Sequence, residues 1–583
     1  MEKVRVQING KLVEVSKDAT VLEAANQAGI DIPRLCFLKG INETSACRIC
    51  VVEIEGIRTL KNSCTVKVSD GMVVRTNTER VRKTVINNLQ LLAGNHKFEC
   101  WKCPREHNCE FLRLLRRYNI ENVIGESDVH VKKDFITNIT DSMVIDSSKC
   151  VLCGRCISTC EKVAGQRVLN YNNRGFKTYV GPALNHNLED SGCIYCGKCI
   201  QACPVGAIKE KDDVQKAIDL LQSDYYVVAQ VAPAVRAALG EEFGNKIGTN
   251  VEGKMYHALE KLGFDDVTDV NFGADVTIME EGTEFIERLQ NGGKLPMFTS
   301  CSPGWIRYIE MNYPQYLPNL STTKSPQQIQ GAVIKHYYAD KLGVAKDKIK
   351  VISFMPCIAK KSEAKRPEME SDGIRDVDLV LTTRELARLI KIMNIDFNNL
   401  EDHTPSSPLA KYTGAGVIFG ATGGVMEAAL RTVSHILEGK DLDPLDIEAV
   451  RGAKDGIKEA TIKVAGMDVN VAVVHGAVNM PEMMARIAKG DKQYHFIEFM
   501  ACTGGCVNGG GQPIVNADVL EKCDVRELRA KTLYSIDKHC AQRQSHENEE
   551  VLRVYSELLG KPGSHLAHEL LHTHYQAKGK YTK

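Results

Sequence analysis

The chain has 583 residues, of which 43% are hydrophobic and 25% charged, and 74 Lys and Arg balance 74 Asp and Glu. A formal net charge of zero argues against nucleic acid or a membrane surface as a partner, and no apolar run approaches the roughly 18 residues of a membrane span. Its 21 cysteines are grouped at metal-ligand spacings, and the opening segment has no secretory-signal pattern. We therefore expect a cytoplasmic, metal-binding protein rather than a disulfide-linked one.

Residues 1–80 are predicted to form a small domain that holds a [2Fe–2S] cluster. Alternating strands at 4–8 and 12–15 surround an Asn-Gly pair typical of a hairpin turn, and a helical segment follows at 21–25. Four cysteines come next: Cys36, Cys47, Cys50 and Cys64. Four thiolates after hairpin strands suit a [2Fe–2S] cluster on a β-grasp ferredoxin fold; a four-cysteine zinc site is the alternative.

Residues 81–137 are helical in pattern and carry a second group of metal ligands. The group consists of His96, Cys100, Cys103 and Cys109. Three cysteines and a histidine would by themselves also suit zinc. Because a ferredoxin-like segment lies on each side, we predict a [4Fe–4S] cluster with one imidazole ligand, whose neutral donor should raise the cluster potential.

Residues 138–210 contain the most specific motif of the chain, a duplicated C-x2-C-x2-C-x3-C run. The first run is Cys150, Cys153, Cys156 and Cys160, and the second is Cys193, Cys196, Cys199 and Cys203. In two-cluster bacterial ferredoxins the fourth cysteine of each run binds the other cluster. We therefore predict two [4Fe–4S] clusters, with Cys160 and Cys203 exchanged between the runs.

Residues 211–583 change to an α/β pattern. Apolar, β-branched runs at 225–229, 351–354, 379–381 and 469–474 alternate with amphipathic helices, which indicates largely parallel, buried sheets. Of the six cysteines left over, Cys523 and Cys540 have no motif around them. The other four lie in loops rich in Pro or Gly: Cys301, Cys357, Cys502 and Cys506.

A glycine-rich stretch at 500–511 is the centre of this last region. Glycine permits positive φ and lets the backbone approach something bulky, which among so many cysteines we interpret as a metal–sulfur cluster. Two upstream loops, 299–305 and 355–361, are expected to converge on it. Together the three loops predict a fifth cluster site.

On these motifs the chain resembles the clostridial-type [FeFe]-hydrogenases over essentially its whole length. The three signature loops of that family look like 299–305, 355–361 with Glu363 following, and 498–511. The resemblance implies an α+β multidomain protein with four accessory clusters and a catalytic domain at 211–583 that includes a fused small-subunit-like tail. Residues 1–210 are also similar to the large iron–sulfur subunit of respiratory NADH dehydrogenase, which lacks the three loops.

The resemblance implies a catalytic H-cluster, a [4Fe–4S] cube joined to a diiron unit that carries CO, cyanide and azadithiolate. The cube would be held by Cys357, Cys502, Cys506 and one residue of the first loop, with Cys506 bridging to the diiron unit. Residues expected around the diiron unit are Lys360, Met355, Met500 and Gln327. Lys360 would donate a charge-assisted hydrogen bond to a cyanide.

The resemblance also implies a proton relay to the cavity. Its members would be Cys301, Glu281, Ser321, Glu284 and Arg288. Buried carboxylates with raised pKa values pass protons near neutral pH. A lone Glu pair at this helical spacing would otherwise be interpreted as a solvated helix face.

One position departs from the family pattern, which usually reads Thr-Ser-Cys-Cys-Pro-Gly-Trp in the first loop. Here Ser302 replaces the second cysteine. Either Ser302 binds the cube through oxygen while Cys301 relays protons, or the loop shifts and Cys301 becomes the ligand. Opposite side-chain directions in an extended loop oppose the shift, and the preference of iron for thiolate favours it.

The tail contains a sequence that matches the zinc-protease pattern H-E-x-x-H, from His568 to His572. Only 11 residues follow it, and the segment from 545 to 575 resembles the small-subunit-like region of the hydrogenases. We expect a packing and hydrogen-bonding role.

The sequence therefore predicts reversible reduction of protons to H2, with electrons exchanged with a ferredoxin or similar carrier. Separate maturation proteins would supply the diiron unit, and the chain would be a monomer. Two alternatives stay open: a low-turnover or sensory hydrogenase, because of Ser302, and a non-catalytic electron-transfer subunit.

Overall fold

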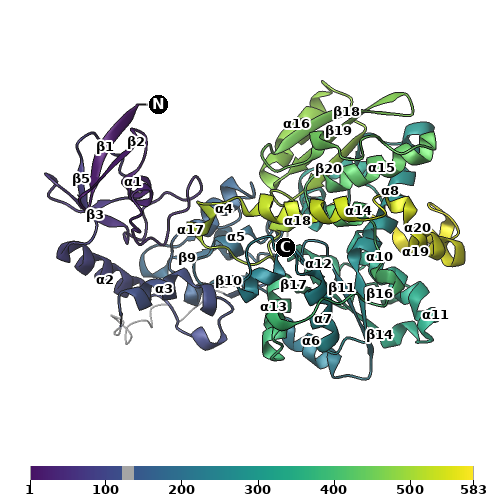
Figure 1. The fold of residues 1–583 in the computed structure, drawn as a ribbon, viewed down its shortest axis with the longest axis horizontal. Coiled ribbons are helices and arrows are strands. Elements are labelled where there is room, and N and C mark those ends of the chain that lie inside the picture. The colour runs from purple at the N-terminus through teal and green to yellow at the C-terminus, as the bar shows by residue number, and fades with distance from the viewer. Residues whose placement is uncertain (1, 121–136, 582–583) are drawn as a thin grey trace.

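The computed structural model describes residues 2–120 and 137–581, so residues 121–136 of the predicted helical segment lie outside the described residues. Figure 1 shows a smaller lobe built from the N-terminal part of the chain and a larger lobe built from the C-terminal part. Helices and strands are mixed in both lobes. None of the described helices has the length and apolar character needed to cross a membrane.

The N-terminal lobe begins with a five-stranded sheet in the order β2-β1-β5-β3-β4. Its strands are β1 (Lys3–Ile8), β2 (Lys11–Ser16), β3 (Val51–Ile54), β4 (Lys61–Asn62) and β5 (Val73–Arg75). The predicted hairpin is present, since β1 and β2 pair antiparallel and the turn residues Asn9 and Gly10 have φ of 47° and 86°. Helix α1 (Val21–Gln27) begins with a capping box at Thr20.

Two further helices lie beneath this sheet in Figure 1 and belong to the second module, which carries His96. They are α2 (Glu79–Ala93) and α3 (Glu110–Arg117). Cys109 caps α3, since its Sγ accepts the amide of Leu112 at 3.4 Å. The segment between the two helices contains all four predicted ligands and is made of short turns.

The third module, residues 138–210, has the same local geometry at each of its two cysteine runs, as the duplicated motif predicts. Helices α4 (Arg155–Lys162) and α5 (Lys198–Ala202) each follow a glycine in the left-handed region, Gly154 at φ 79° and Gly197 at φ 72°. A three-stranded sheet, β10-β7-β6, supports them. The strands of this module are β6 (Thr137–Ile139), β7 (Met143–Asp146), β8 (Asn170–Asn172), β9 (Tyr179–Gly181) and β10 (Ile208–Glu210).

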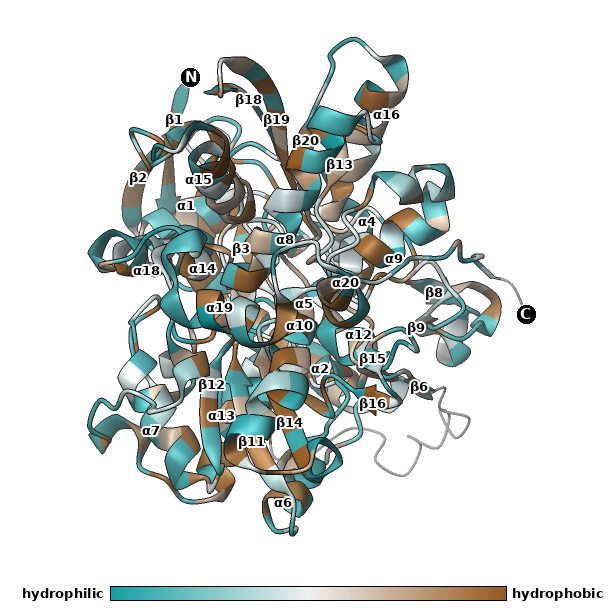
Figure 2. Cartoon of the chain, turned by 90° about the vertical axis from the view of Figure 1, so that its right-hand side faces the viewer, coloured by the Kyte–Doolittle hydropathy of each residue, from teal (hydrophilic) through white to brown (hydrophobic). Residues whose placement is uncertain are grey.

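The large lobe contains two four-stranded sheets. The first, β12-β11-β14-β17, is parallel throughout and consists of β11 (Tyr226–Val231), β12 (Asp266–Asp269), β14 (Ile349–Met355) and β17 (Leu379–Thr382). Figure 2 shows β11 and β14 as largely hydrophobic strands. Their side chains are almost all buried, which confirms the predicted buried parallel strands.

The second sheet has the order β13-β20-β19-β18. It consists of β13 (Met297–Phe298), β18 (Ile457–Val464), β19 (Met467–His475) and β20 (Phe496–Met500), and only the β18–β19 pair is antiparallel. Strand β20 ends at Met500 and β14 ends at Met355, and each is followed directly by a cysteine-bearing loop. The carboxyl ends of these strands therefore position the predicted site.

The remaining elements cover the sheets and form the C-terminal region. They are α6 (Val214–Leu221), α7 (Glu252–Lys261), α8 (Val270–Asn291), α9 (Pro303–Asn312), α10 (Pro326–Val333), α11 (Ala339–Leu342), α12 (Ala359–Glu363), β15 (Glu370–Ser371), β16 (Ile374–Arg375), α13 (Thr383–Ile392), α14 (Gly414–Ile418), α15 (Gly424–Glu438), α16 (Met480–Lys489), α17 (Ala517–Leu520), α18 (Val525–His539), α19 (Glu549–Val554) and α20 (His565–Leu571).

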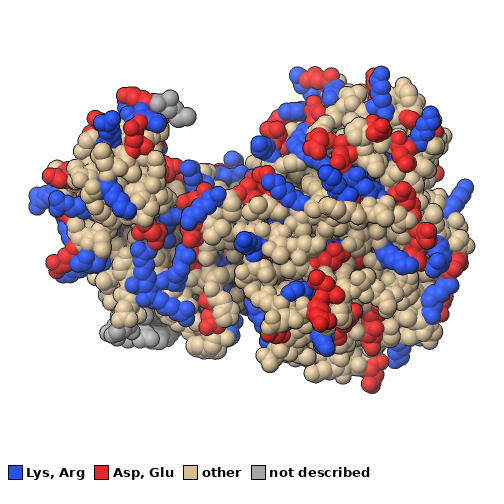
Figure 3. Space-filling view, viewed as in Figure 1, with Lys and Arg blue, Asp and Glu red and all other residues tan. Residues whose placement is uncertain are grey.

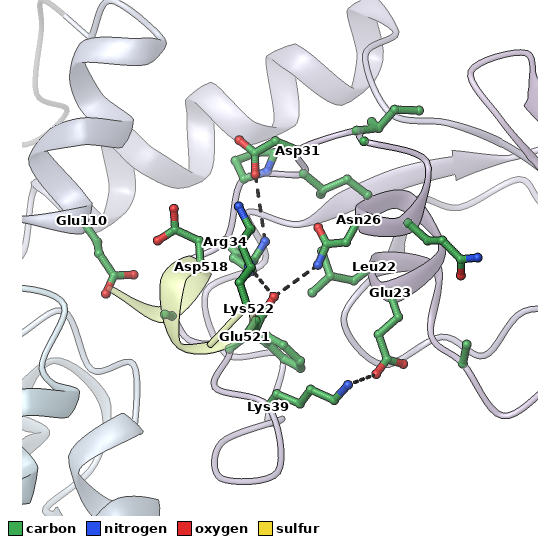
Figure 4. A pocket seen from close by; sticks show the side chains of 18 of the residues that line it. Leu22, Glu23, Asn26, Asp31, Arg34, Lys39, Glu110, Asp518, Glu521 and Lys522 are labelled. Atoms are coloured by element: carbon green, nitrogen blue, oxygen red, sulfur yellow. Dashed lines mark hydrogen bonds and ion pairs between the residues drawn. The ribbon is translucent and has the colours of Figure 1, made fainter. Parts of the chain in front are cut away.

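Many polar contacts join the modules, and two of them are buried or lie in a cleft. Arg155 of α4 makes a bidentate ion pair with Glu110 of α3, at 2.8 and 2.9 Å, and also donates to the carbonyl of Phe37 in the first module. In a cleft between the first module and α17, Glu521 accepts from Arg34 at 2.9 Å and from Asn26 at 3.2 Å (Figure 4). No cysteine lines that cleft, which separates it from the predicted cluster sites.

Candidate functional site

One cavity of the large lobe is lined by residues of all three predicted loops. The predicted residues in its wall are Cys301, Ser302, Gln327, Met355, Cys357, Lys360, Met500, Cys502 and Cys506. They come from the segments after β13, β14 and β20 and from the start of α10. The three distant loops therefore meet, as the sequence predicts.

Three thiols face one another in this cavity. Cys357 follows β14, and Cys502 and Cys506 follow β20. Burial raises the pKa of Cys357 to about 12, with Cys502 adding to the effect, and burial with Cys357 and Cys502 does the same for Cys506. Buried thiols that oppose each other's ionisation become stable thiolates when a cationic metal core lies between them, so this donor set fits an iron–sulfur cube.

The glycines of the third loop also make close contacts with neighbouring backbone. A Cβ on Gly509 would lie 2.2 Å from the carbonyl oxygen of Pro356, and one on Gly510 would lie 2.4 Å from that of Cys196. Gly505 has φ of 90°, and both Gly505 and Gly509 line the cavity. These glycines bring the third loop against the second loop and against the beginning of α5.

Cys301 and Ser302 both reach the cavity but have different neighbours. Burial raises the pKa of Cys301, and Glu281 is the charged group that adds most to the effect. The hydroxyl of Ser302 accepts the amide of Ala501 at 3.3 Å, next to Cys502. The side chain of Cys301 therefore lies near the carboxylates, whereas that of Ser302 lies near the third loop.

Lys360 is held at the cavity wall by a dense set of acceptors. Its Nζ donates to Ser325 Oγ at 2.7 Å, to Glu363 Oε2 at 2.8 Å and to the carbonyl of Cys301 at 3.1 Å. Gln327 donates to the same Glu363 at 3.1 Å. The carboxylate of Glu363 therefore holds both side chains at the cavity wall, and the ammonium of Lys360 places a positive charge there.

Three of the predicted relay residues, Glu284, Arg288 and Ser321, form a connected group at helix α8. Glu284 accepts from Arg288 at 2.5 Å and from Ser321 at 2.9 Å. Glu281 is buried, and its two oxygens have no hydrogen-bond partner among the described residues. Burial, with Glu284 adding to it, raises the pKa of Glu281 to about 8, although Ser321 lies near enough to lower it in part. The pair is thus not a solvated helix face.

The four thiols of the first module also converge. Cys50 Sγ and Cys64 Sγ lie 3.3 Å apart, and Cys36 and Cys47 interact through their side chains. Ser45 Oγ lies 3.4 Å from Cys64 Sγ. All four cysteines are buried, which fits a compact four-thiolate cluster site.

The His96 group lies against the two-cluster module. His96 Nδ1 is 2.8 Å from the carbonyl of Lys149, an arrangement that fixes the ring orientation of a metal-binding histidine. A Cβ on Gly206 would lie 2.4 Å from Cys103 Sγ, and Cys109 Sγ lies 3.7 Å from the carbonyl of Pro204. These contacts place the group next to the second cysteine run.

The eight cysteines of the two-cluster module divide into the two predicted sets. Burial raises the pKa of Cys156, with Cys153, Cys150 and Cys203 adding most to it. Burial likewise raises the pKa of Cys199, with Cys196, Cys193 and Cys160 adding most. The fourth thiol of each run therefore lies with the other run.

Several cavity residues are absent from the sequence-based prediction. Cys196 lines the cavity although it belongs to a predicted accessory set. Burial raises the pKa of its thiol, and a negative charge on Cys502 adds to this effect. Phe419 and Pro233 contribute apolar wall. Glu498, buried in the middle of β20 and outside the cavity wall, accepts amides of Gly423 and Met426 at 2.7 and 2.8 Å. Of these residues, Cys196 carried a sequence signal as a member of the second cysteine run, and Glu498 as part of the third loop.

The H-E-x-x-H sequence has no metal-site geometry around His572. Its Nε2 lies 3.0 Å from Glu280, and its Nδ1 lies 2.8 Å from Thr322 Oγ1. Because both ring nitrogens have protein partners, His572 joins the C-terminal region to α8. The expected packing and hydrogen-bonding role is confirmed for this residue.

Four family models match the chain. They describe the C-terminal domain of the iron-only hydrogenase large subunit (residues 225–510), the iron hydrogenase small subunit (523–578), a 2Fe-2S iron-sulfur cluster binding domain (1–79) and the ferredoxin-like domain of NADH-quinone oxidoreductase subunit 3 (140–209).

Whole-chain relatives agree with these models. Iron hydrogenase 1 of Clostridium pasteurianum is 45% identical over 98% of this chain and 99% of its own length. The NADP-reducing hydrogenase subunit HndD of Solidesulfovibrio fructosivorans is 45% identical over 99% of this chain and 99% of its own length. A solved structure of a variant of [FeFe]-hydrogenase HydA1 from Chlamydomonas reinhardtii is 38% identical with a TM-score of 0.57, covering 63% of this chain and all of that one.

Proposed function

This chain belongs to the iron-only, or [FeFe], hydrogenase family, and we propose that the cavity bounded by its three loops is where two protons and two electrons combine reversibly into H2. The observation that carries this proposal is the meeting of Cys357, Cys502 and Cys506 in one cavity with Lys360. When bound, the H-cluster supplies the redox centre of the reaction. The residues of the chain hold it, exclude water and move protons and electrons to it.

For the cluster itself, the proposed ligands of the cube are Cys357, Cys502, Cys506 and Ser302. The position of Ser302 beside the Ala501 amide supports this choice, because that contact turns its oxygen toward the third loop. Met355 and Met500 offer soft, polarisable side chains around the diiron unit. The ammonium of Lys360 and the amide of Gln327 are the donors that would orient its diatomic ligands.

For protons, we propose the order Arg288, Glu284, Ser321, Glu281 and Cys301. Glu281 is the decisive member because its carboxyl, with a pKa of about 8, holds a proton near neutral pH in a buried position. Its lack of a hydrogen-bond partner among the described residues leaves room for an exchangeable donor such as water. Cys301 would then pass the proton into the cavity.

For electrons, we propose one [2Fe–2S] and three [4Fe–4S] clusters in the N-terminal 210 residues. The thiol group around Cys196 is the one that adjoins the cavity, which supports a route from the two-cluster module to the H-cluster. The His96 group adjoins that module in turn through Cys103 and Gly206. The proposed domain limits are 1–80, 81–137, 138–210 and 211–583.

The proposed carrier is a ferredoxin or a similar one-electron protein in the cytoplasm, and separate maturation proteins would insert the diiron unit. A partner subunit that handles a nicotinamide is the second candidate, because one whole-chain relative is named a subunit of an NADP-reducing hydrogenase. The chain would otherwise act as a monomer.

The experiment that tests the proposal is anaerobic reconstitution with the diiron unit, followed by infrared spectroscopy and an H2 assay. We expect bands from iron-bound CO and CN⁻ together with H2 production from reduced methyl viologen. A fully iron-loaded protein that shows neither would be an electron-transfer subunit only, and the proposed function would be wrong.

A further inference from the structure

Trp101 is an unusually exposed side chain for its size. It lies in the short turn between Cys100 and Cys103, and 78% of it is accessible to solvent. The other tryptophan, Trp305, is fully buried and stacks on Phe499. Leaving an indole in water forgoes a large hydrophobic gain, and tryptophan is among the residues enriched at the energetic centres of protein interfaces.

The surface around this indole is basic. Residues 79–117 contain nine Lys and Arg against four Glu, a net charge of +5 in a chain whose net charge is zero. Lys97 and Lys102 share the carboxylate of Glu99 at 3.0 and 2.9 Å, yet their side chains remain 54% and 59% exposed. Figure 3 shows Lys and Arg gathered on the small lobe in the region of α3.

Arg116 adds a further charge on the same side. It is exposed on α3, and its charge partly offsets the effect of burial in raising the pKa of Cys100. Its neighbours Arg113 and Arg117 are already paired, with Asp518 and Asp31. Lys97, Lys102 and Arg116 outnumber the nearby carboxylates of Glu99 and Glu106, so a net positive charge remains beside the turn that carries Trp101, and such a field steers and orients an acidic protein.

The turn that carries Trp101 also contacts the two-cluster module, through which we propose that electrons pass to the cavity. Cys103, two residues on, packs against Gly206 of the two-cluster module. A protein seated on Trp101 would thus place its redox centre close to the His96 group, which leads inward.

We propose that Trp101, with Lys97, Lys102 and Arg116, forms the docking surface for a small acidic one-electron carrier protein of the ferredoxin class. The inference rests on the proposed function and adds the place of electron entry. Each docked carrier is oxidised by one electron and the His96-bound cluster is reduced by one. Two such encounters, with two protons from the relay, balance one H2.

The test compares two electron donors in an anaerobic H2-evolution assay on the iron-loaded, matured enzyme. One donor is a reduced acidic ferredoxin, and the other is reduced methyl viologen, a small dye that needs no docking surface. Trp101→Ala and the double variant Lys97→Ala/Lys102→Ala are measured against Leu184→Ala and Lys440→Ala/Lys463→Ala. Leu184 is 87% exposed on the two-cluster module, and Lys440 and Lys463 are exposed in the large lobe.

We expect both test variants to raise the KM for ferredoxin about tenfold, with the kcat and the dye-driven rate within twofold of the parent. Added salt should weaken ferredoxin binding to the parent and have less effect on the double lysine variant. The control variants should match the parent. If Trp101→Ala loses iron, the lysine variant decides the result.

The docking proposal is overturned if the test and control variants have the same KM for ferredoxin, or if salt does not change ferredoxin binding to the parent. It is overturned as well if Trp101→Ala lowers the ferredoxin-driven and the dye-driven rates equally. It is also overturned if Trp101→Ala changes the oligomeric state, because a second copy of the chain would then cover the surface. A parent enzyme that evolves no H2 with either donor would refute the proposed function instead.

Discussion

Glu281 shows how burial can suit a single carboxyl to the proton-transfer role that we propose for it. Helix α8 places it in the interior, with Glu284 one turn further along the helix. Burial opposes its negative form, so its pKa rises to about 8 and the group is largely neutral at pH 7. At this pKa the same carboxyl would, in the proposed relay, donate a proton for H2 formation and accept one during H2 oxidation.

The first prediction concerns Glu281→Gln. The amide fills the same space but carries no exchangeable acidic proton, so turnover should fall by about two to four orders of magnitude. Iron content and the infrared bands should stay unchanged. H2 evolution by the parent should decline as the pH rises through about 8, because the carboxyl then loses its proton. Normal turnover in the variant would contradict the relay.

The same carboxyl links stability to pH. Its pKa is raised on folding, so the folded state binds more protons than the unfolded state between about pH 4.5 and 8. The parent should therefore lose stability across this interval as the pH rises, and Glu281→Gln should lose less. Thermal melting at pH 6 and pH 8.5 measures the difference; identical shifts would contradict the raised pKa.

The second prediction concerns Ser302. If its oxygen is the fourth ligand of the cube, Ser302→Cys should slow iron loss to a chelator about tenfold, because thiolate binds iron better than a hydroxyl oxygen. Ser302→Ala should speed it. The cube alone suffices for this measurement, before the diiron unit is inserted.

Ser300→Ala provides the matched control, since that hydroxyl lies in the same loop and donates to the carbonyl of Thr323. Equal iron retention in the parent and both Ser302 variants would mean that Cys301 is the ligand. In that case Cys301→Ala should release iron.

At the scale of elements, close loop contacts bring the two-cluster module against the cavity. The third loop meets the beginning of α5 where Gly510 faces Gly197 and the carbonyl of Cys196. Any side chain here would push the Cys196 thiol group away from the cavity. A backbone contact at this point thus sets the distance that an electron would have to cross on the proposed route.

The third prediction is that Gly510→Ala destabilises the protein by about 1–3 kcal/mol, the usual cost of overpacking. Its Cβ would lie 2.4 Å from the Cys196 carbonyl oxygen, which cannot move away freely. H2 evolution with an external donor should also slow. Gly192→Ala is the control, because its Cβ meets only the flexible side chain of Lys580, at 3.5 Å, and that of Val168, at 3.8 Å. Equal melting temperatures for the two variants would contradict this account.

At the scale of the whole molecule, Arg155 joins three modules at one buried point. It is 1% exposed and binds Glu110 of the His96 module and the carbonyl of Phe37 in the first module. A bidentate pair of this kind fixes orientation as well as contributing energy. This one side chain therefore helps to set the relative positions of the three modules.

The fourth prediction is that Arg155→Ala costs about 3–5 kcal/mol, because Glu110 is left as an unpaired buried charge. Ferredoxin-driven H2 evolution should fall further than the dye-driven rate. Arg75→Ala is the control, since its pair with Glu55 is 63% and 65% exposed and should contribute less than about 1 kcal/mol. Comparable melting temperatures for Arg155→Ala and Arg75→Ala would contradict the claim that Arg155 joins the modules.

Sequence alone was enough to predict the candidate ligands and how they are grouped. Spacing alone separated the duplicated cysteine runs from the His96 group, because ligands of one cluster must lie within a few residues or recur in a fixed pattern. Strand alternation and the Asn-Gly turn predicted the first hairpin, and apolar runs predicted the parallel strands. The family resemblance added Lys360, Gln327 and the relay residues.

How the predicted loops and residues meet became visible only in the folded chain. That Cys196 reaches the cavity, that Glu281 has no hydrogen-bond partner among the described residues and that Gly510 packs on backbone all depend on segments hundreds of residues apart. Local sequence cannot encode such contacts, since burial and the electrostatics that follow from it arise when the sheets and loops pack together. The difference between Cys301 and Ser302, adjacent in sequence, is likewise set by their neighbours across the cavity.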